Sequence, residues 1–309
     1  MSHKKLDRRT FLQAGLSLFP LSVLASNFDY FKKQPLLSFS TLGCPDWEFD
    51  HILDFAVKNG YQGIEIRGIK RQVDLFQCPE FASTAAIAST RRKFKDHKLS
   101  IVDLGSSVAL HHTGQAERQK NLDDGKRYID LAHALGCPFV RVFPNNLPKD
   151  NTREAVMQLI ISGLQQLGDY AKSSGVTVLM ESHGEVVWAA DILRIMEAAE
   201  NPRVGLVWDI TNMWTVTKEP PATVYTQLKK YIHHTHIKDA KLDGGKLKYV
   251  LLGQGDTPIF DAIDILRKDG YKGYYSFEWE KLWHPDIAEP EIALADYPIA
   301  MKKHFSKKI

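Results

Sequence analysis

Short apolar runs and longer amphipathic stretches alternate along the chain from Leu36 onward, with a period of about 30 to 40 residues. The apolar runs predict eight strands, over residues 36–42, 63–67, 100–104, 139–143, 176–182, 204–210, 233–238 and 274–279. The amphipathic stretches predict helices over residues 49–58, 81–97, 116–134, 153–173, 189–199, 223–230, 259–268 and 292–302. Because parallel strands need helix-sized connections, this alternation predicts a parallel sheet.

Eight strand and helix units in this length match a (β/α)8 barrel, which typically has about 250 residues. The alternative is an open, doubly wound sheet, which usually carries a glycine-rich dinucleotide loop after its first strand. Here that position reads Thr41-Leu-Gly43-Cys-Pro45. We therefore predict an α/β fold with one domain, a single TIM barrel over residues 31–309.

The first 30 residues have the layout of a signal peptide with a short linker. Arg8-Arg9 and Phe11-Leu12 precede an uncharged, mostly apolar run over residues 14–25. The paired arginines resemble a twin-arginine export signal. The run is too short for a stable membrane anchor, so we expect cleavage near residue 26 and a periplasmic protein. A charged tail leading into an apolar helix is the alternative.

Replacing Arg8 and Arg9 with lysine is expected to block export, because the pathway reads the arginine pair. Immunoblots of periplasmic and cytoplasmic fractions measure this. Unchanged export, or an intact Met1 terminus on the periplasmic protein, would contradict the prediction.

Charge and cysteine content remove some classes of protein. The chain has 40 Lys and Arg against 37 Asp and Glu, a net charge of +3. The excess lies in the first 26 residues, so the body is neutral, and we expect no nucleic-acid partner. Three separate cysteines, Cys44, Cys78 and Cys137, form neither a disulfide framework nor a zinc motif, and we expect them to be buried. The sequence leaves a homo-oligomer open.

Polar residues end four consecutive predicted strands in the later half of the chain: Glu181, Asp209, His236 and Glu278. Barrel active sites are built at this end of the strands. Three carboxylates repel one another unless a cation lies among them, and three carboxylates with one imidazole suit one divalent ion. We expect Mn²⁺, with Mg²⁺, Co²⁺ or Zn²⁺ as alternatives. The competing interpretation is separate ion pairs, such as Glu181 with Arg141 or Glu278 with Lys238.

Other residues near strand ends are candidate substrate contacts: His183, Lys238, Arg67, Arg141, Glu280 and Trp214. We expect Glu65, beneath Arg67 on the second strand, to be the ion-pair partner of that arginine. His234, one layer below His236, is expected to be a hydrogen-bonded core residue. Gly253-Gln-Gly255 would let backbone N–H groups approach a ligand.

Several motifs together resemble the xylose isomerase-like barrels of the sugar phosphate isomerase/epimerase family. They are Thr41-Leu-Gly43-Cys44-Pro45-Asp46-Trp47, Gly60-Tyr-Gln-Gly63-Ile-Glu65-Ile-Arg67-Gly68, Val-Trp-Asp209, His234-Thr-His236-Ile-Lys238-Asp239 and Gly253-Gln-Gly255-Asp256. The resemblance implies that Glu181, Asp209, His236 and Glu278 bind one divalent metal and that the two glutamates transfer protons beside the substrate. One departure is Asn212, where the ketose epimerases and the endonuclease IV branch have histidine. It counts against a three-zinc phosphodiesterase.

These observations predict a divalent-metal-dependent sugar isomerase or epimerase that acts on a small carbohydrate. Glu181 and Glu278 would move protons next to a carbonyl, through an enediolate. The close alternative is β-elimination by a 3-keto-glycoside lyase at the same site. Alternatives from other classes are a metal-dependent phosphodiesterase of the endonuclease IV type and a non-catalytic sugar-binding barrel.

Overall fold

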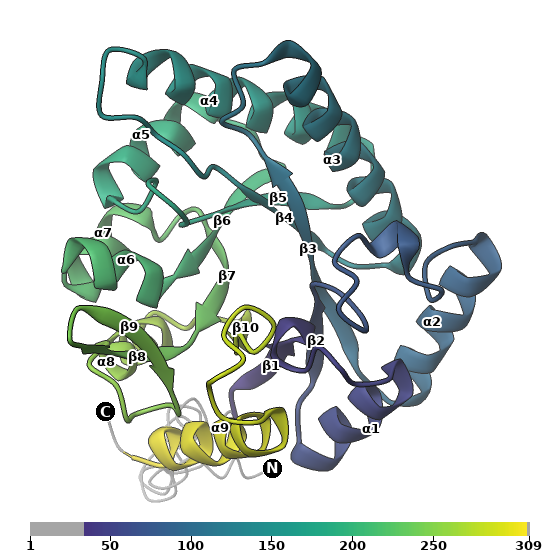
Figure 1. The fold of residues 1–309 in the computed structure, drawn as a ribbon. Helices are drawn as coiled ribbons and strands as arrows, with labels where there is room; N and C mark the ends of the chain where they lie inside the picture. Colours follow the sequence, from purple (N-terminus) through teal and green to yellow (C-terminus); the bar gives the residue numbers. More distant parts are fainter. Residues whose placement is uncertain (1–33, 308–309) are drawn as a thin grey trace, which may run out of the picture. The chain divides into compact units, whose positions relative to one another are not determined.

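Eight parallel strands close into a barrel in the computed structural model, which describes residues 34–307 (Figure 1). Around the barrel the order is β1-β10-β7-β6-β5-β4-β3-β2. The strands are β1 (Leu36–Ser40), β2 (Gly63–Ile66), β3 (Ser100–Ala109), β4 (Phe139–Phe143), β5 (Thr177–Glu181), β6 (Val204–Asp209), β7 (Ile232–Ile237) and β10 (Tyr274–Phe277). The predicted barrel is therefore confirmed.

Helices surround the ring of strands, as Figure 1 shows. They are α1 (Phe49–Asn59), α2 (Thr84–Asp96), α3 (Gln115–Leu135), α4 (Arg153–Tyr170), α5 (Ala189–Ala199), α7 (Pro221–Leu228), α8 (Ile259–Lys268) and α9 (Pro290–Phe305). The connections between residues 34 and 307 also contain short 3₁₀ turns, η3 (Thr41–Gly43), η4 (Leu75–Gln77) and η5 (Ala171–Ser173). Gly60 and Gly136 end α1 and α3 with φ of 77° and 72°, the left-handed conformation that glycine adopts at little cost.

Two elements were not predicted from the sequence. Helix α6 (Ile210–Thr217) follows β6 directly. The antiparallel hairpin of β8 (Asp239–Asp243) and β9 (Lys246–Val250) follows β7 and turns at Gly244 and Gly245, which have φ of 55° and 81°. Both elements lie at the carboxyl ends of their strands, so they border the mouth of the barrel.

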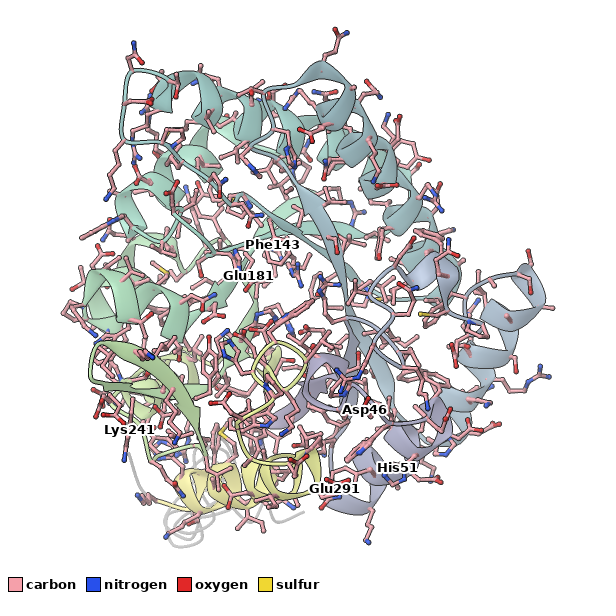
Figure 2. The ribbon with its side chains drawn as sticks, in the orientation of Figure 1. Asp46, His51, Phe143, Glu181, Lys241 and Glu291 are labelled. Atoms are coloured by element: carbon pink, nitrogen blue, oxygen red, sulfur yellow. The ribbon has the colours of Figure 1, made fainter. Side chains whose placement is uncertain are left out.

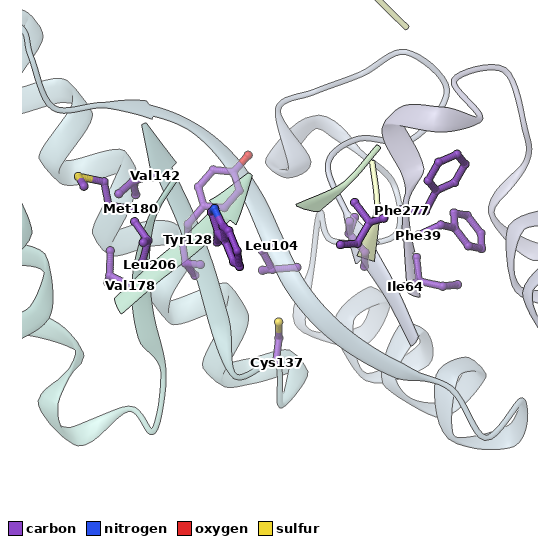
Figure 3. Close-up of a cluster of buried hydrophobic side chains, with 14 of the residues drawn as sticks. Phe39, Ile64, Leu104, Tyr128, Cys137, Val142, Val178, Met180, Leu206 and Phe277 are labelled. Carbon is purple, nitrogen blue, oxygen red and sulfur yellow. The ribbon is translucent and has the colours of Figure 1, made fainter. Parts of the chain in front are cut away.

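The main apolar core lies between the strands and the helices. Figure 3 shows part of it, with Phe39, Ile64, Leu104, Val142 and Phe277 projecting from their strands. Each of these side chains is at most 1% exposed. The three cysteines are free and buried, as predicted.

The alternate positions of the strands face the barrel interior, and many of them are polar. Glu65 of β2 accepts hydrogen bonds from residues of β7 and β10, although β1 separates β2 from β10 in the barrel. These contacts therefore cross the interior. These polar side chains lie directly below the mouth of the barrel. They can therefore hold the side chains of a functional site in position through hydrogen bonds.

The predicted signal peptide, and the domain boundary near residue 30, lie outside the described residues. Of the helices in residues 34–307, none is both long and apolar enough to cross a membrane.

Candidate active site

Four side chains converge at the carboxyl ends of β5, β6, β7 and β10, which are neighbours in the barrel: Glu181, Asp209, His236 and Glu278. Each offers one ligand atom, and these atoms all lie within 4.8 Å of one another. All four side chains are buried. Figure 2 shows Glu181 beside Phe143 inside the ring of strands, whereas Lys241 lies outside it on the β8–β9 hairpin. The structure thus brings together the four residues that the sequence predicted as ligands.

The start of helix α6 fixes the orientation of Asp209. Its Oδ1 accepts a hydrogen bond of 2.8 Å from the backbone N–H of Asn212, so Asp209 is the N-cap of the helix. Ser182 Oγ accepts a 2.9 Å hydrogen bond from the backbone N–H of Asp209. Oδ2 is therefore left to face the cluster, where it lies 3.8 Å from His236 Nδ1.

Glu65 holds the imidazole of His236 from below. His236 Nε2 lies 3.0 Å from Glu65 Oε2, whereas Nδ1 lies 3.3 Å from both Glu181 Oε1 and Glu278 Oε2. If Nε2 donates its proton to Glu65, the lone pair of Nδ1 faces the carboxylates and is free to bind a cation. Although burial opposes ionisation, His236 and His234 hold the pKa of Glu65 well below its usual value.

The predicted ion pair between Glu65 and Arg67 is wrong. Glu65 Oε2 also lies 3.1 Å from His234 Nε2 and accepts a 3.2 Å hydrogen bond from Ser276 Oγ. Alternation places Arg67 one layer higher than Glu65, at the mouth, whereas both histidines reach the Glu65 carboxylate from across the interior. His234 is a buried, hydrogen-bonded residue.

Glu65→Gln is expected to weaken Mn²⁺ binding by about 10- to 100-fold, because the neutral amide no longer favours the tautomer and orientation of His236. Titration calorimetry measures the dissociation constant. The control is Glu48→Gln, which removes an exposed carboxylate paired with Lys70. An equal dissociation constant in Glu65→Gln and Glu48→Gln would contradict this role.

Lys238 supplies the nearest positive charge to the carboxylates. Its Nζ lies 2.7 Å from Asp209 Oδ2, 2.6 Å from Glu278 Oε2 and 2.5 Å from Glu280 Oε1. Despite its burial, Asp209, Glu278 and Glu280 raise the pKa of Lys238 well above its usual value. On the other side, Arg141 Nε lies 3.1 Å from Glu181 Oε2. The two ion pairs that were the alternative to a metal site, Glu181 with Arg141 and Glu278 with Lys238, are thus present. The four proposed ligands nevertheless converge as well.

The cluster fits a divalent cation. Asp209 Oδ2 and Glu181 Oε2 are buried and accept no hydrogen bond of good geometry from the described residues, although Lys238 and Arg141 lie near them. Burial, reinforced by Glu278 and Glu181, raises the pKa of Asp209 to about 7 even though Lys238 lowers it. A divalent ion takes such ligands at about 2.0–2.3 Å, so it would satisfy the oxygens that the protein leaves open.

A cavity of about 230 Å³ opens above this cluster, and its lining residues are Leu42, Arg67, Arg141, Phe143, Glu181, His183, Lys238, Glu278, Glu280 and Trp283. Five of the six predicted substrate contacts are in this lining. Trp214 is not: it lies on α6, with Lys218 Nζ 3.5 Å from the centre of its ring. Trp283, 52% exposed, stands at the mouth instead.

A larger cavity, of about 630 Å³, lies at the opposite end of the barrel. Its lining includes Ser100, Phe139 and Tyr274, the first residues of β3, β4 and β10. Chemistry in these barrels occurs at the carboxyl end of the strands, and the larger cavity has no carboxylate in its lining, so we place the active site in the smaller one.

His183 is a neutral polar group in the cavity wall. Its Nδ1 lies 2.9 Å from Asn145 Oδ1, which leaves Nε2 for a ligand. Burial lowers the pKa of His183, and Arg141 and Lys238 act in the same direction although Glu181 opposes them. The ring is therefore uncharged near pH 7 and can exchange a hydrogen bond with a hydroxyl group.

Two further residues beside the site were missed from the sequence. Asp103 of β3 is fully buried, and both of its oxygens lack a hydrogen-bond partner among the described residues. Burial and the neighbouring Glu65 raise the pKa of Asp103 to about 8. Tyr249 of β9 lies with its ring centre 5.5 Å from Lys238 Nζ. A polar residue within the apolar run of residues 100–104 was the signal for Asp103.

The backbone N–H groups of the Gly253-Gln-Gly255 turn, predicted to approach a ligand, bind a side chain of the protein. The N–H groups of Gly253 and Gly255 donate hydrogen bonds of 2.8 and 2.9 Å to Asp239 Oδ2. A Cβ at position 255 would lie 2.0 Å from Asp239 Oδ1, so only glycine allows this approach. The turn closes the base of the β8–β9 hairpin beside the cavity.

Comparisons with known proteins agree with the fold. The chain is 30% identical to an inosose dehydratase of Lacticaseibacillus casei over 288 residues, which cover 83% of this chain and 88% of the relative. It is 24% identical to an inosose isomerase of Halalkalibacterium halodurans over 268 residues, 82% of this chain and 92% of the relative. The crystal structure of the IOLI protein with a bound zinc atom superposes with a TM-score of 0.72 at 21% identity, over 88% of this chain and 99% of that one.

The prediction of an enzyme is confirmed, because both curated relatives are enzymes and each is matched over most of its length. The sequence profile described as "Xylose isomerase-like TIM barrel" matches residues 53–297, most of the chain. The chain belongs to the xylose isomerase-like TIM barrel family.

Proposed function

We propose that this protein is a divalent-metal-dependent enzyme that moves a proton next to the carbonyl group of a small sugar or of an inosose, the keto form of a cyclitol. The observation that supports the proposal is the position of Glu181 and Glu278 in the active site. Both carboxylates line the cavity, and both also belong to the four-residue cluster that fits a cation. A group that removes a proton next to a carbonyl must lie close to the charge that stabilises the resulting oxyanion.

The protein keeps Glu278 ionised, which is the form that a general base needs. Burial opposes its ionisation, but His236 and Lys238 hold the pKa of Glu278 well below its usual value. Glu181 is also held ionised, because His236 and Arg141 outweigh burial and the repulsion from Glu278, so its pKa is lowered. A divalent cation held by the cluster would supply positive charge at the substrate carbonyl oxygen. His183 and Lys238 in the cavity wall would orient the hydroxyl groups.

We favour isomerisation or epimerisation, in which the proton returns to carbon. Elimination is the second candidate, because the 30% identical relative is a dehydratase, and a dehydratase expels a leaving group after the same first step. A 3-keto-glycoside lyase is the form of elimination that suits an exported enzyme, and we propose that this protein is exported. For the metal we propose one Mn²⁺ per chain; the zinc atom of the IOLI structure supports Zn²⁺ as the alternative.

Hydrogen exchange at carbon tests the proposal. Free ketoses, inososes and 3-keto-glycosides are incubated in D₂O with the Mn²⁺-loaded protein, and NMR and mass spectrometry follow the carbon next to the carbonyl. A true substrate gains deuterium there. An unchanged carbon skeleton then indicates an isomerase or epimerase, whereas release of water, an aglycone or a second sugar indicates elimination. Turnover of none of these compounds, together with cleavage of a phosphodiester, would refute the proposal.

A further inference from the structure

Two buried arginines form one wall of the active-site cavity. Arg67 is 6% exposed and Arg141 is 1% exposed, and both line the cavity. They meet over Gly105 of β3, where a Cβ would lie 2.7 Å from Arg67 Cδ and 3.0 Å from Arg141 Nη2. A glycine is therefore what allows two guanidinium groups to enter the mouth side by side.

The positive charge of Arg141 is already compensated. Its Nε lies 3.1 Å from Glu181 Oε2, and its Nη1 donates a 2.7 Å hydrogen bond to the carbonyl oxygen of Ser106. Its guanidinium also lies over the ring of Phe143, 3.8 Å from the centre. Arg141 thus has a counter-ion, a backbone acceptor and a stacking partner, which together hold it in place.

Arg67 has only neutral partners. Its Nη2 donates to Ser107 Oγ at 3.0 Å, and its Nη1 donates a long hydrogen bond of 3.4 Å to the carbonyl oxygen of Val73. Among the described residues, no carboxylate oxygen lies within the 4.0 Å of an ion pair with Arg67. A buried charge without a counter-ion is costly, so its retention in a ligand cavity indicates that the ligand supplies the counter-ion.

The other cations near the cavity cannot take that role. Lys238 contacts Asp209, Glu278 and Glu280, and Arg141 contacts Glu181. A cation in the cluster would occupy Asp209 and Glu278 and leave Lys238 with Glu280. Arg67 would remain without an anionic partner whether or not that cation is bound.

We propose that the substrate carries a carboxylate that pairs with Arg67, in addition to the carbonyl group at the cluster. This inference rests on the proposed function and names the substrate class: a hydroxy acid of one ring or one short chain that also has a carbonyl group, such as a uronate or a carboxylated keto-cyclitol. The planar fork of a guanidinium matches a carboxylate in two parallel hydrogen bonds. The cavity of about 230 Å³ suits one small ring. A phosphate also fits this fork, but Arg141 and Lys238, the other two cations of the lining, already pair with carboxylates, so neither is left for its second charge.

Binding of matched acid and neutral compounds tests this without turnover. The pairs are D-glucuronate with D-glucose and quinate with myo-inositol, and D-glucose 6-phosphate tests the phosphate. Calorimetry with the Mn²⁺-saturated protein measures the dissociation constants. In at least one pair, the acid is expected to bind about 10- to 100-fold more tightly than its neutral partner. Equal binding of acid and neutral compounds, no binding by any acid, or a preference for the phosphate would each overturn the proposal.

Variants assign that preference to Arg67. Arg67→Gln is expected to lose the preference for acids while keeping its Mn²⁺, which excludes carboxylate binding to the metal as the cause. Arg194→Gln, which removes an exposed arginine paired with Glu154, is the control and should keep the preference. Survival of the preference in Arg67→Gln would overturn the proposal. If the preference follows Arg67 but no compound exchanges deuterium, only the proposed function fails.

Melting temperature separates a ligand role from a structural one. Arg67→Met keeps the length of the buried side chain and removes a charge that has no counter-ion, so it is expected to melt at the wild-type temperature or above it. If Arg67 instead stabilises the mouth through Val73 and Ser107, this variant will melt several degrees lower, and the assignment to a substrate carboxylate would be wrong.

Discussion

Glu278→Gln is expected to lower the rate of deuterium exchange into a true substrate by about a thousandfold, the middle of the range for loss of a general base. Glutamine keeps an oxygen near the cation cluster and in the cavity wall, but an amide cannot accept the proton. The dissociation constant of a substrate analogue should change much less than the rate. The variant therefore separates loss of the chemical step from loss of binding.

Two measurements keep the Glu278 prediction falsifiable. Metal content must be determined for each preparation, because Glu278 is also a proposed ligand. The control is Glu154→Gln, which removes an exposed carboxylate paired with Arg194 and should exchange at the wild-type rate. If metal-loaded Glu278→Gln exchanges deuterium as fast as this control, another group is the base, and Glu181 is the next to replace.

The barrel could be predicted from the sequence because its signal is repeated eight times. Each strand is a short apolar run, each helix has apolar residues three and four apart, and glycines such as Gly60 and Gly136 end the helices. The convergence of Glu181, Asp209, His236 and Glu278 follows from the same regularity. Residues at the carboxyl ends of neighbouring parallel strands meet at one mouth, so their spacing along the chain does not matter.

Helix α6 could not be predicted by that reasoning. It has eight residues, Ile-Thr-Asn-Met-Trp-Thr-Val-Thr, and four of these are threonine or valine, which disfavour helix, besides the isoleucine that starts it. Its start depends on the carboxylate of Asp209, which caps Asn212. The sequence shows a strand ending in an aspartate, and only the tertiary structure shows that one oxygen of that aspartate begins a helix. The hairpin had a signal, the Gly244-Gly245 pair between two alternating segments, which favours a tight turn.

The prediction that Glu65 pairs with Arg67 was wrong for a related reason. Arg67 is two residues away, just past the end of β2, and alternation directs its side chain to the same face as Glu65, so sequence distance favours it. The partners in the structure, His234 and His236, come from a strand about 170 positions later, and they reach Glu65 because the barrel is closed. Contacts across a barrel interior depend on which layers face one another. That depends on the stagger of the strands, which a single sequence does not reveal.

Asp209→Asn is expected to abolish stoichiometric metal binding and activity without lowering the melting temperature of the metal-free protein. Asparagine is as good an N-cap as aspartate, so the hydrogen bond to Asn212 that begins α6 can be kept. What is lost is the ligand Oδ2, together with the charge that faces His236 and Lys238. Asp209→Ala removes both the ligand and the cap, so it should also cost about 1 kcal/mol of stability.

The difference between these two variants separates metal binding from folding. Three measurements are made on both proteins: metal analysis after purification in Mn²⁺, thermal melts in a chelator and the exchange assay. The control is Asp191→Asn, because Asp191 pairs with Arg153 on the outer helices. Because the remaining ligands would be Glu181, His236 and Glu278, residual weak binding is allowed, but one ion per chain after dialysis is not. Stoichiometric metal in a double variant, Asp209→Ala with His236→Ala, would place the metal site elsewhere and remove the basis for Glu278 as a base beside a bound cation.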